Sequence, residues 1–270
     1  MINLMIKINQ KIDNPLEHKT ECLILPCAEE KKPSGTLKTI DGCLNGAITQ
    51  AFENKRFEGK PNQTLLLNGA GSLKTNNLIL VGVGKTTDVS PENFCRASAT
   101  AAKLAESSNF KSISVDLSCF DKITKGKAGL YGELAGAVAE GAGLALYHFD
   151  EYKSRDEKDD PPSRVEKLTL VPASKARTTV VGKSIARAEK IVSAVHTARD
   201  LISHPGNTAT PTFLANHAKK MARKNKITCK VLGKKEMEKL GMGALLGVSR
   251  GSHEPPALIV LEYFGASKKK

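Results

Sequence analysis

Strand-like and helix-like segments alternate along the first half of this 270-residue chain, and this alternation constrains the fold more than any other feature of the sequence. The run 77–82 is apolar at nearly every position, as in a strand that is covered on both faces. Segments of helical length separate the strands, and parallel strands need such crossover connections. The sequence therefore predicts an α/β fold with a largely parallel sheet.

Apolar runs, helical spacing and capping residues place the expected elements. Strands are expected at 5–8, 22–26, 64–67, 77–82, 113–117, 168–171, 227–232 and 257–263. Helices are expected at 42–52, 92–107, 132–148, 183–202, 211–225 and 234–240. Ser90 and Thr210 suit N-cap positions, each followed by a proline at the first helical residue, and Gly241 suits a helix C-terminus.

Two of the expected helices carry patterns that predict how they pack. In helix 183–202 the apolar positions recur every three or four residues, which places them on one face: Ile185, Ala188, Val192, Val195, Ala198 and Ile202. In helix 132–148 the residues that predict close packing against a neighbouring helix are small: Gly132, Ala135, Gly136, Ala139 and Ala142. Proline cannot continue a helix, so His204-Pro205-Gly206-Asn207 is expected to end the longer one.

The chain is strongly basic, with a formal net charge of +13. Its basic residues form short groups: Lys31-Lys32, Lys219-Lys220, Arg223-Lys224, Lys234-Lys235 and Lys268 to Lys270. Such groups gain affinity for nucleic acid by releasing counterions, but with 4% aromatic residues and no Trp there is little material for base stacking. A solvated basic surface is expected, and weak, backbone-directed DNA binding is the alternative. The charged run 152–167, with Pro161-Pro162, is expected to be a surface loop.

The segment Met1 to Lys7 lacks the pattern of a secretory signal, and no apolar run reaches the ~18 residues of a membrane span. A soluble, cytoplasmic protein without a membrane partner is expected. Six cysteines are scattered without a C-x-x-C pair: Cys22, Cys27, Cys43, Cys95, Cys119 and Cys229. Buried free thiols are therefore expected, rather than disulfides or zinc ligands.

Several short motifs fall short of a functional pattern. The run Gly82 to Thr87 contains the Gly-Lys-Thr of a phosphate-binding loop, but Ile79 stands where the pattern needs glycine, so a strand-end turn is expected. The pairs Gly69/Gly71 and Gly141/Gly143 lack the third glycine of a dinucleotide fingerprint. Neither H-E-x-x-H nor G-x-S-x-G occurs in the sequence. His253 and Glu254 are expected to form a hydrogen-bonded loop pair, since two ligands do not complete a metal site.

Three segments resemble one enzyme family in the order that the family has them. They are A-V-A-E-G-A-G-L-A-L-Y-H-F-D-E-Y-K-S at 137–154, the helix end and proline-containing loop at 198–214, and 240–265 with its E-P-P-A-L-I-V-L-E-Y. The chain resembles the leucyl aminopeptidase family, exopeptidases that remove N-terminal residues from peptides with two metals. The resemblance implies an α/β fold with a macro-domain-like three-layer N-terminal domain at 1–172, a linking helix at 173–204 and a truncated start of the peptidase domain at 205–270.

The resemblance also implies where the chemistry of the family lies. Complete members hold two divalent metals, zinc or manganese, through G-K-G-x-T-F-D-[ST]-G-G and N-T-D-A-E-G-R motifs, and neither string occurs in this sequence. No catalytic, cofactor-binding or metal-binding residue is therefore assigned, and no cofactor is expected in this chain. Asp200, Glu254 and Glu262 are expected to lie too far apart to replace the missing ligands.

Three interpretations remain open at this point. The preferred one is an aminopeptidase-family protein, a fragment or a degenerate relative, that is inactive alone. The second is a basic module that binds DNA or a nucleotide-like ligand. The third is a subunit that joins a separately encoded catalytic half or a homo-oligomer, with peptides as substrates only once it is completed. Because an apolar strand at 257–263 leaves a sheet edge open, the segment 205–270 is expected to be less stable than the first domain or to need a partner.

Overall fold

The computed structural model describes residues 6–69, 71, 73–154 and 163–265, and the chain divides into two compact units, Met1–His196 and Thr197–Lys270. Several of the expectations above concern residues outside these ranges: the chain start at 1–5, Ala70 between Gly69 and Gly71, Pro161-Pro162 in the charged run, and the terminal lysines 268–270. The domain boundaries expected at 172 and 204 stay predictions. Within the described residues, no helix combines the length and apolar character needed to cross a membrane.

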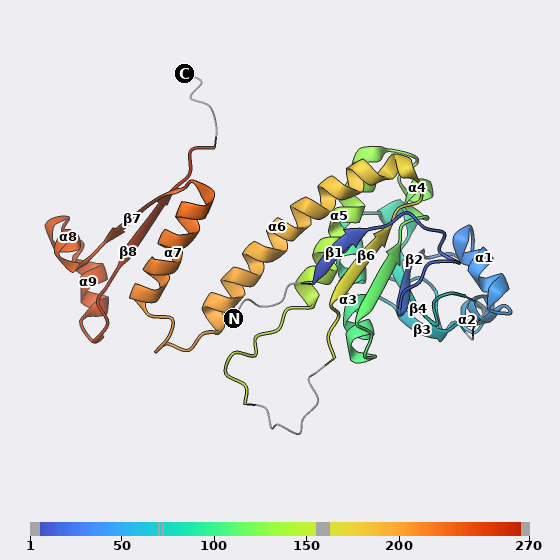
Figure 1. Cartoon of the computed structure of the whole chain (residues 1–270), viewed down its shortest axis with the longest axis horizontal. Coiled ribbons are helices and arrows are strands. Elements are labelled where there is room, and N and C mark those ends of the chain that lie inside the picture. The colour runs from blue at the N-terminus through green and yellow to red at the C-terminus, as the bar shows by residue number, and fades with distance from the viewer. Residues whose placement is uncertain (1–5, 70, 72, 155–162, 266–270) are drawn as a thin grey trace, which may run out of the picture. The chain divides into compact units, whose positions relative to one another are not determined.

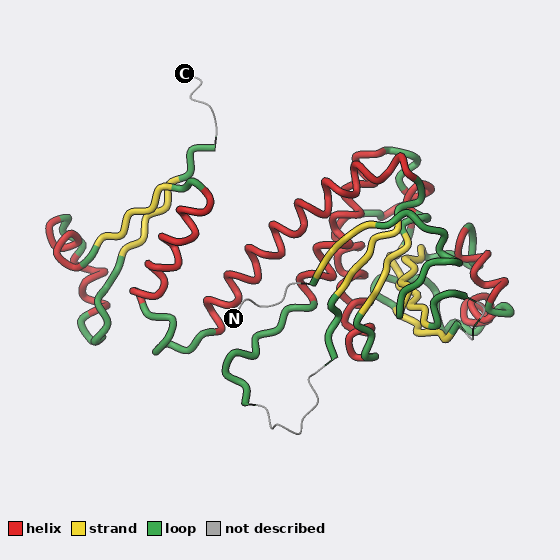
Figure 2. Tube along the Cα trace, in the orientation of Figure 1, coloured by secondary structure: helices red, strands yellow, loops and turns green. Residues whose placement is uncertain are grey.

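The first unit contains a six-stranded sheet in the order β1-β6-β5-β2-β4-β3 (Figures 1 and 2). All neighbouring strands are parallel except β3 and β4, which are antiparallel. The predicted α/β class with a largely parallel sheet is confirmed. The strands are β1 (Lys7–Gln10), β2 (Cys22–Ala28), β3 (Thr64–Asn68), β4 (Asn77–Gly84), β5 (Ser112–Asp116) and β6 (Lys167–Val171).

Helices cover both faces of this sheet. They are α1 (Thr36–Cys43), α2 (Ala47–Glu53), α3 (Pro91–Ser107), α4 (Phe120–Ile123), α5 (Ala128–Ala145) and α6 (Thr178–Ser203). One buried cluster joins Ile24 and Ile79 of the sheet to α3, α5 and α6, and the other joins Leu23 and Leu80 to α1 and α2. Successive strand residues point to opposite faces, so a nearly continuous apolar run serves both clusters.

The expected helix at 42–52 is wrong, because the structure has two short helices there, α1 and α2. Asn45 and Gly46 between them have positive φ angles of 52° and 79°, which interrupts a right-handed helix. The Asp41 carboxylate then accepts the backbone N–H groups of Ile48 and Thr49, at 2.7 and 3.1 Å, and so caps the start of α2. Helix α4 and the 3₁₀ turns Thr86–Asp88 and Lys175–Arg177 were not predicted, since they are too short to show a period.

Helix α6 begins at Thr178, five residues before its expected start. Its buried residues are Val181, Ile185, Ala188, Val192 and His196. The predicted apolar face is therefore correct up to Val192 and wrong beyond it, since Val195, Ala198 and Ile202 are exposed. His196 takes the place of Val195 because its Nε2 lies 3.1 Å from the Gly143 carbonyl of α5, which accepts its hydrogen bond.

The close helix packing expected from small residues is confirmed. A Cβ on Gly141 of α5 would overlap the backbone of Cys95 in α3, and a Cβ on Gly132 would overlap Val180 of α6. Helix α5 thus touches a helix on either side through glycine surfaces. The N-cap predictions are also confirmed, because the Ser90 hydroxyl accepts the Asn93 N–H and the Thr210 hydroxyl accepts the Phe213 N–H.

The second unit is a smaller α/β assembly. It contains α7 (Pro211–Asn225), β7 (Thr228–Leu232), α8 (Lys234–Lys239), α9 (Gly243–Ser249) and β8 (Leu258–Glu262). The two strands pair antiparallel, with Cys229 opposite Leu261. Helix α9 was not predicted, and the expected stop at Gly241 after α8 is confirmed by its φ of 67°.

Candidate functional site

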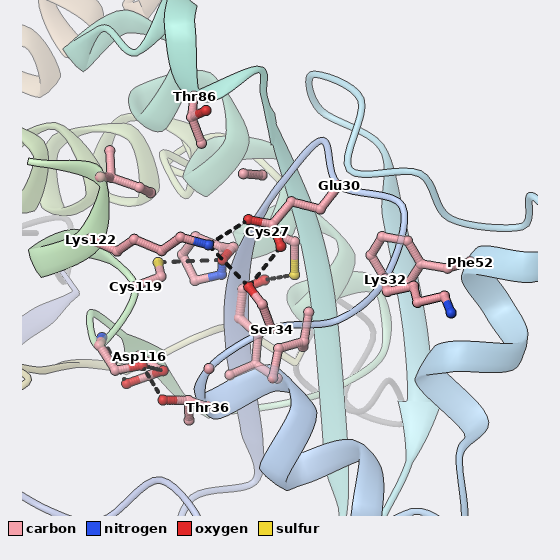
Figure 3. A pocket seen from close by; sticks show the side chains of 17 residues that line it. Cys27, Glu30, Lys32, Ser34, Thr36, Phe52, Thr86, Asp116, Cys119 and Lys122 are labelled. Atoms are coloured by element: carbon pink, nitrogen blue, oxygen red, sulfur yellow. Dashed lines mark hydrogen bonds and ion pairs between the residues drawn. The ribbon is translucent and has the colours of Figure 1, made fainter.

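The first unit has a pocket at the carboxyl ends of the neighbouring parallel strands β2 and β5, with a volume of about 160 Å³ (Figure 3). After β2 the chain turns into α1 and α2 on one face of the sheet, and after β5 it turns into α4 and α5, which pack on the other. Because the connections after β2 and β5 lie on opposite faces of the sheet, a crevice remains between the ends of these two strands. Ligands bind in such crevices in open α/β sheets. We call it the switch-point pocket.

Two loops and two helices supply its lining. Apolar walls come from Leu25, Pro26, Leu37, Phe52 and Ile123. The polar side chains lie mainly on the segments that follow β2 and β5: Glu30, Lys32, Ser34, Thr36, Asp116, Ser118 and Lys122. A mostly apolar cavity with a few convergent polar groups is the usual form of a small-molecule site.

One polar group of the pocket is centred on Asp116 at the end of β5. The Ser118 backbone N–H donates to its Oδ1 at 3.1 Å, and the Ser118 hydroxyl donates to its Oδ2 at 2.5 Å. Because that hydroxyl has only one hydrogen, Thr36 is the donor in its 2.8 Å hydrogen bond to Ser118. Burial raises the pKa of Asp116 to about 6, and the bonds from Ser118 oppose this rise. The carboxyl therefore changes its protonation state close to neutral pH.

The second polar group joins Glu30 and Lys122 across the pocket. Lys122 Nζ lies 3.0 Å from Glu30 Oε1, and Ser34 donates its hydroxyl to Glu30 Oε2 at 2.7 Å (Figure 3). Burial alone would raise the pKa of Glu30, but the hydrogen bonds from Ser34 and Lys122 outweigh it and lower the pKa below its usual value. This pair therefore stays charged and links the loop after β2 to α4.

Two thiols, Cys27 and Cys119, also line the pocket. Burial raises the pKa of both thiols far above the ordinary range, so they remain protonated and are poor nucleophiles or metal ligands. All six cysteines are free; Cys22 and Cys27 are buried residues, and the other four, Cys119 among them, are partly buried. The pocket is thus suited to binding a small molecule rather than to hydrolysis by these groups.

The acidic residues considered from the sequence do not form a metal site. Among the residues that the structure describes, no group of three or more His, Cys, Asp or Glu side chains could hold a metal ion, and this includes Asp200, Glu254 and Glu262. His253 and Glu254 are both exposed, and the Glu254 N–H bonds to the Ser252 hydroxyl at 3.1 Å rather than to the imidazole. The expected His253–Glu254 hydrogen bond is therefore wrong. The described residues do not fit the two-metal centre that the resemblance implies.

The glycine motif at 82–87 does not form a phosphate-binding loop. Strand β4 continues to Gly84, a 3₁₀ turn covers Thr86–Asp88, and α3 starts only at Pro91. Gly82 has a packing reason instead, because a Cβ there would overlap the carbonyl of Lys60. Only Thr86 of this motif lines the switch-point pocket.

The residues of the switch-point pocket were missed by sequence reasoning. Asp116 was visible as a polar residue at the end of an apolar strand, a weak signal for a site at the sheet edge. Thr36, which bonds to the Ser118 hydroxyl, is 82 positions away from Ser118 in the sequence, and nothing local indicates that β2 and β5 are neighbours.

Proteins of one family match this chain along most of its length. The model of the cytosol aminopeptidase family, N-terminal domain, matches residues 24–156, and that of the catalytic domain matches residues 196–270. The probable cytosol aminopeptidase of Geobacter sp. (strain M21) is 35% identical over 265 residues, which cover 98% of this chain and 51% of that protein. That of Alkaliphilus oremlandii (strain OhILAs) is 32% identical over 262 residues, or 96% of this chain and 51% of the relative.

Solved structures of similar fold include a leucine aminopeptidase. A mutant of tomato leucine aminopeptidase has a TM-score of 0.80 and 25% identity over 98% of this chain and 52% of its own. The bottromycin maturation enzyme BotP has a TM-score of 0.63 and 25% identity over 91% of this chain and 46% of its own. The class is therefore an α/β protein with the fold of the leucine aminopeptidase N-terminal domain. The chain belongs to the cytosol aminopeptidase family, as its resemblance predicted, and spans about half the length of the curated relatives that it matches.

Proposed function

We propose that this chain supplies the N-terminal domain and the opening of the catalytic domain of a leucyl aminopeptidase, and that these 270 residues alone do not hydrolyse peptides. The match of both family models, in family order, is the observation that carries the assignment. The proposed inactivity rests on chemistry. Two-metal hydrolysis needs convergent carboxylates around both ions, and the described part of the chain has no such group.

The hydrolytic centre then has to come from further polypeptide, which holds two divalent metals, zinc or manganese, in complete family members. Exposed apolar side chains in the second unit support a role as one part of a larger catalytic domain, among them Val248, Tyr263 and Phe264. A separately encoded catalytic half is the proposed partner, and a homo-oligomer is the alternative. The names of the relatives favour the cytoplasm as the compartment.

The test is an assay of the purified 270-residue chain on leucine 4-nitroanilide with added Mn²⁺ or Zn²⁺. We expect no turnover above the metal-only blank, with the full-length Geobacter relative as the positive control. Adding a polypeptide that corresponds to the remaining half of that relative is expected to restore turnover and to bind the chain in gel filtration. Turnover by the chain alone, abolished by a chelator, would contradict the proposal.

A second candidate function is polyanion binding, which the basic face of α7 favours. Lys219, Lys220, Arg223 and Lys224 line a shallow depression together with Asn216, while Ala215, Ala218 and Ala222 face the interior. Phosphate contacts of this kind weaken steeply with salt. A gel shift of duplex DNA at low salt, lost in a variant with all four basic residues changed to Gln, supports this function. The absence of a shift at low salt would end it.

A further inference from the structure

A row of polar side chains crosses three strands of the first unit, away from the switch-point pocket. Asn9 of β1 is in register with Thr169 of β6, and Thr169 is in register with Ser114 of β5. Residues in register on neighbouring strands lie on one face of the sheet. On β2 the next residue in this row is the buried Leu23. In this row, this face of the sheet is therefore apolar at β2 and polar at β5, β6 and β1.

His18, from the segment between β1 and β2, lies over this row. Its side chain is 3% exposed, its Nδ1 lies 2.9 Å from Asp13 Oδ2, and its Nε2 lies 2.9 Å from Ser114 Oγ. The two hydrogen bonds join residues that are 5 and 96 positions apart in the sequence. A serine hydroxyl, an imidazole and a carboxylate are therefore linked in series.

The protonation of this series follows from Asp13. Hydrogen bonds from Lys11 and His18 lower the pKa of Asp13 to about 2, so it is a carboxylate at neutral pH. A carboxylate only accepts hydrogen bonds, so the proton of a neutral His18 is on Nδ1. Nε2 is then an acceptor, and the Ser114 hydroxyl donates to it. This is the tautomer that a general base needs to take a proton from serine.

Ser114 lines a cavity of about 280 Å³, although the residue is only 1% exposed. Asn9, His18 and Thr169 also line this cavity. Asn9 Oδ1 is buried and has no hydrogen-bond partner within the described residues. A bound molecule that donates a hydrogen bond would satisfy this oxygen. If the Asn9 side-chain amide were turned over, its N–H group would instead donate to the oxyanion that develops on an ester carbonyl. Lys19 and Lys167 at the rim disfavour cationic molecules.

We propose that Ser114 is a nucleophile activated by His18 and Asp13, and that the cavity beside it accepts small esters without positive charge. A nucleophile bonded to a base that is oriented by a third group is the arrangement that serine hydrolases use, and it is defined by geometry rather than by motif. This geometry brings a serine, a histidine and an aspartate together in a chain that has no G-x-S-x-G motif. The proposal goes beyond aminopeptidase chemistry and needs no metal.

The reaction balances with the groups present and water. Ser114 Oγ bonds to the ester carbonyl carbon while its proton moves to His18 Nε2. The ester C–O bond breaks, and the departing alcohol takes that proton from His18. Water, deprotonated by His18, then attacks the acyl-serine, releases the carboxylic acid and restores the hydroxyl.

The test uses the intact chain and diisopropyl fluorophosphate in the presence of EDTA, which separates it from any metal-dependent activity. Ser114 Oγ would bond to phosphorus and expel fluoride, giving one adduct that peptide mass spectrometry places on Ser114. We expect His18→Gln to slow labelling by about 100-fold or more and Asp13→Asn to slow it at least 10-fold. Ser114→Ala should abolish both the adduct and any turnover of 4-nitrophenyl acetate.

Ser107→Ala is the control. Ser107 is an exposed serine at the end of α3 and does not line this cavity, so accessibility alone would direct the reagent to it rather than to Ser114. Labelling of the control variant should equal that of the wild type. Circular dichroism identifies any variant that fails to fold. An unmodified Ser114 in the folded wild-type chain, or equal labelling rates for wild type and a folded Asp13→Asn variant, would overturn the proposal.

Discussion

The two units of this chain contain similar apolar strands but bury them differently. In the first unit Leu78, Leu80 and Val81 of β4 are at most 1% exposed, between β2 and β3 and under helices on both faces. In the second unit, among the strands that the structure describes, β8 pairs only with β7, and its Leu261 is 45% exposed. The hydrophobic residues buried in that unit are few and include Leu232 and Met237. An apolar run thus predicts a strand, whereas its burial depends on how many elements pack against it.

This contrast has an energetic consequence. Burial of apolar area stabilises by roughly 25 cal/mol per Å², and a small unit with a thin core gains little of it. A two-stranded sheet is marginal by itself, and open strand edges invite pairing with other chains. We therefore expect the second unit to open far more often than the first.

The largest expected effect is on proteolysis. Trypsin at low concentration should cleave within 205–270 on the order of 100-fold faster than within the folded elements of the first unit, because cleavage follows local opening. Mass spectrometry of the fragments over time checks this. A whole chain that resists as one body would contradict the comparison.

Glycine substitutions sharpen the comparison next. Gly141→Ala in α5 should destabilise the first unit by more than about 4 kcal/mol, because the new methyl group overlaps the Cys95 backbone of α3 and neither helix backbone yields easily. Gly247→Ala in α9 of the second unit is the control, since nothing lies within 4 Å of its Cβ position. It should stabilise slightly, by up to ~1 kcal/mol. Thermal unfolding followed by circular dichroism measures both, and equal effects would count against the model of close packing.

Two matched leucine truncations test the cores directly. Leu80→Ala in β4 is expected to cost about 3 kcal/mol, from lost burial and the cavity that remains. Leu261→Ala in β8 is expected to cost no more than about 0.5 kcal/mol, because the side chain is largely in solvent. Urea unfolding gives both values. A cost of several kcal/mol for Leu261 would mean that another polypeptide or a second copy covers β8.

The smallest expected effect concerns pH and the switch-point pocket. The folded pKa of Asp116, about 6, is above its ordinary value of 3.8, so its contribution to stability is present below pH ~4 and is lost as the pH rises through 6. The loss amounts to no more than about 3 kcal/mol. Asp116→Asn should flatten the stability of the first unit between pH 4.5 and 8 and raise it at pH 8. A wild-type stability that rises with pH across this window, unchanged in the variant, would show that another group dominates.

Local signals predicted most of the elements. The caps at Ser90 and Thr210, the apolar run of β4 and the small residues of α5 each act within a few residues, and each gave a correct element or contact. One failure was local, since the break between α1 and α2 depends on the positive φ angles of two adjacent residues. Another arose from distant packing, since the end of the buried face of α6 depends on where α5 offers the Gly143 carbonyl.

Sequence alone determined the α/β class and the family, because strand and helix periods and ordered motifs are properties of short segments. Only the tertiary structure decided that β2 and β5 are neighbours, that Ser118 bonds to Thr36, and that His18 lies against Ser114. These contacts join residues separated by up to 96 positions, and no local preference encodes them. They exist because burying apolar area on both faces of one sheet selects a single strand order, and that order brings the polar groups together.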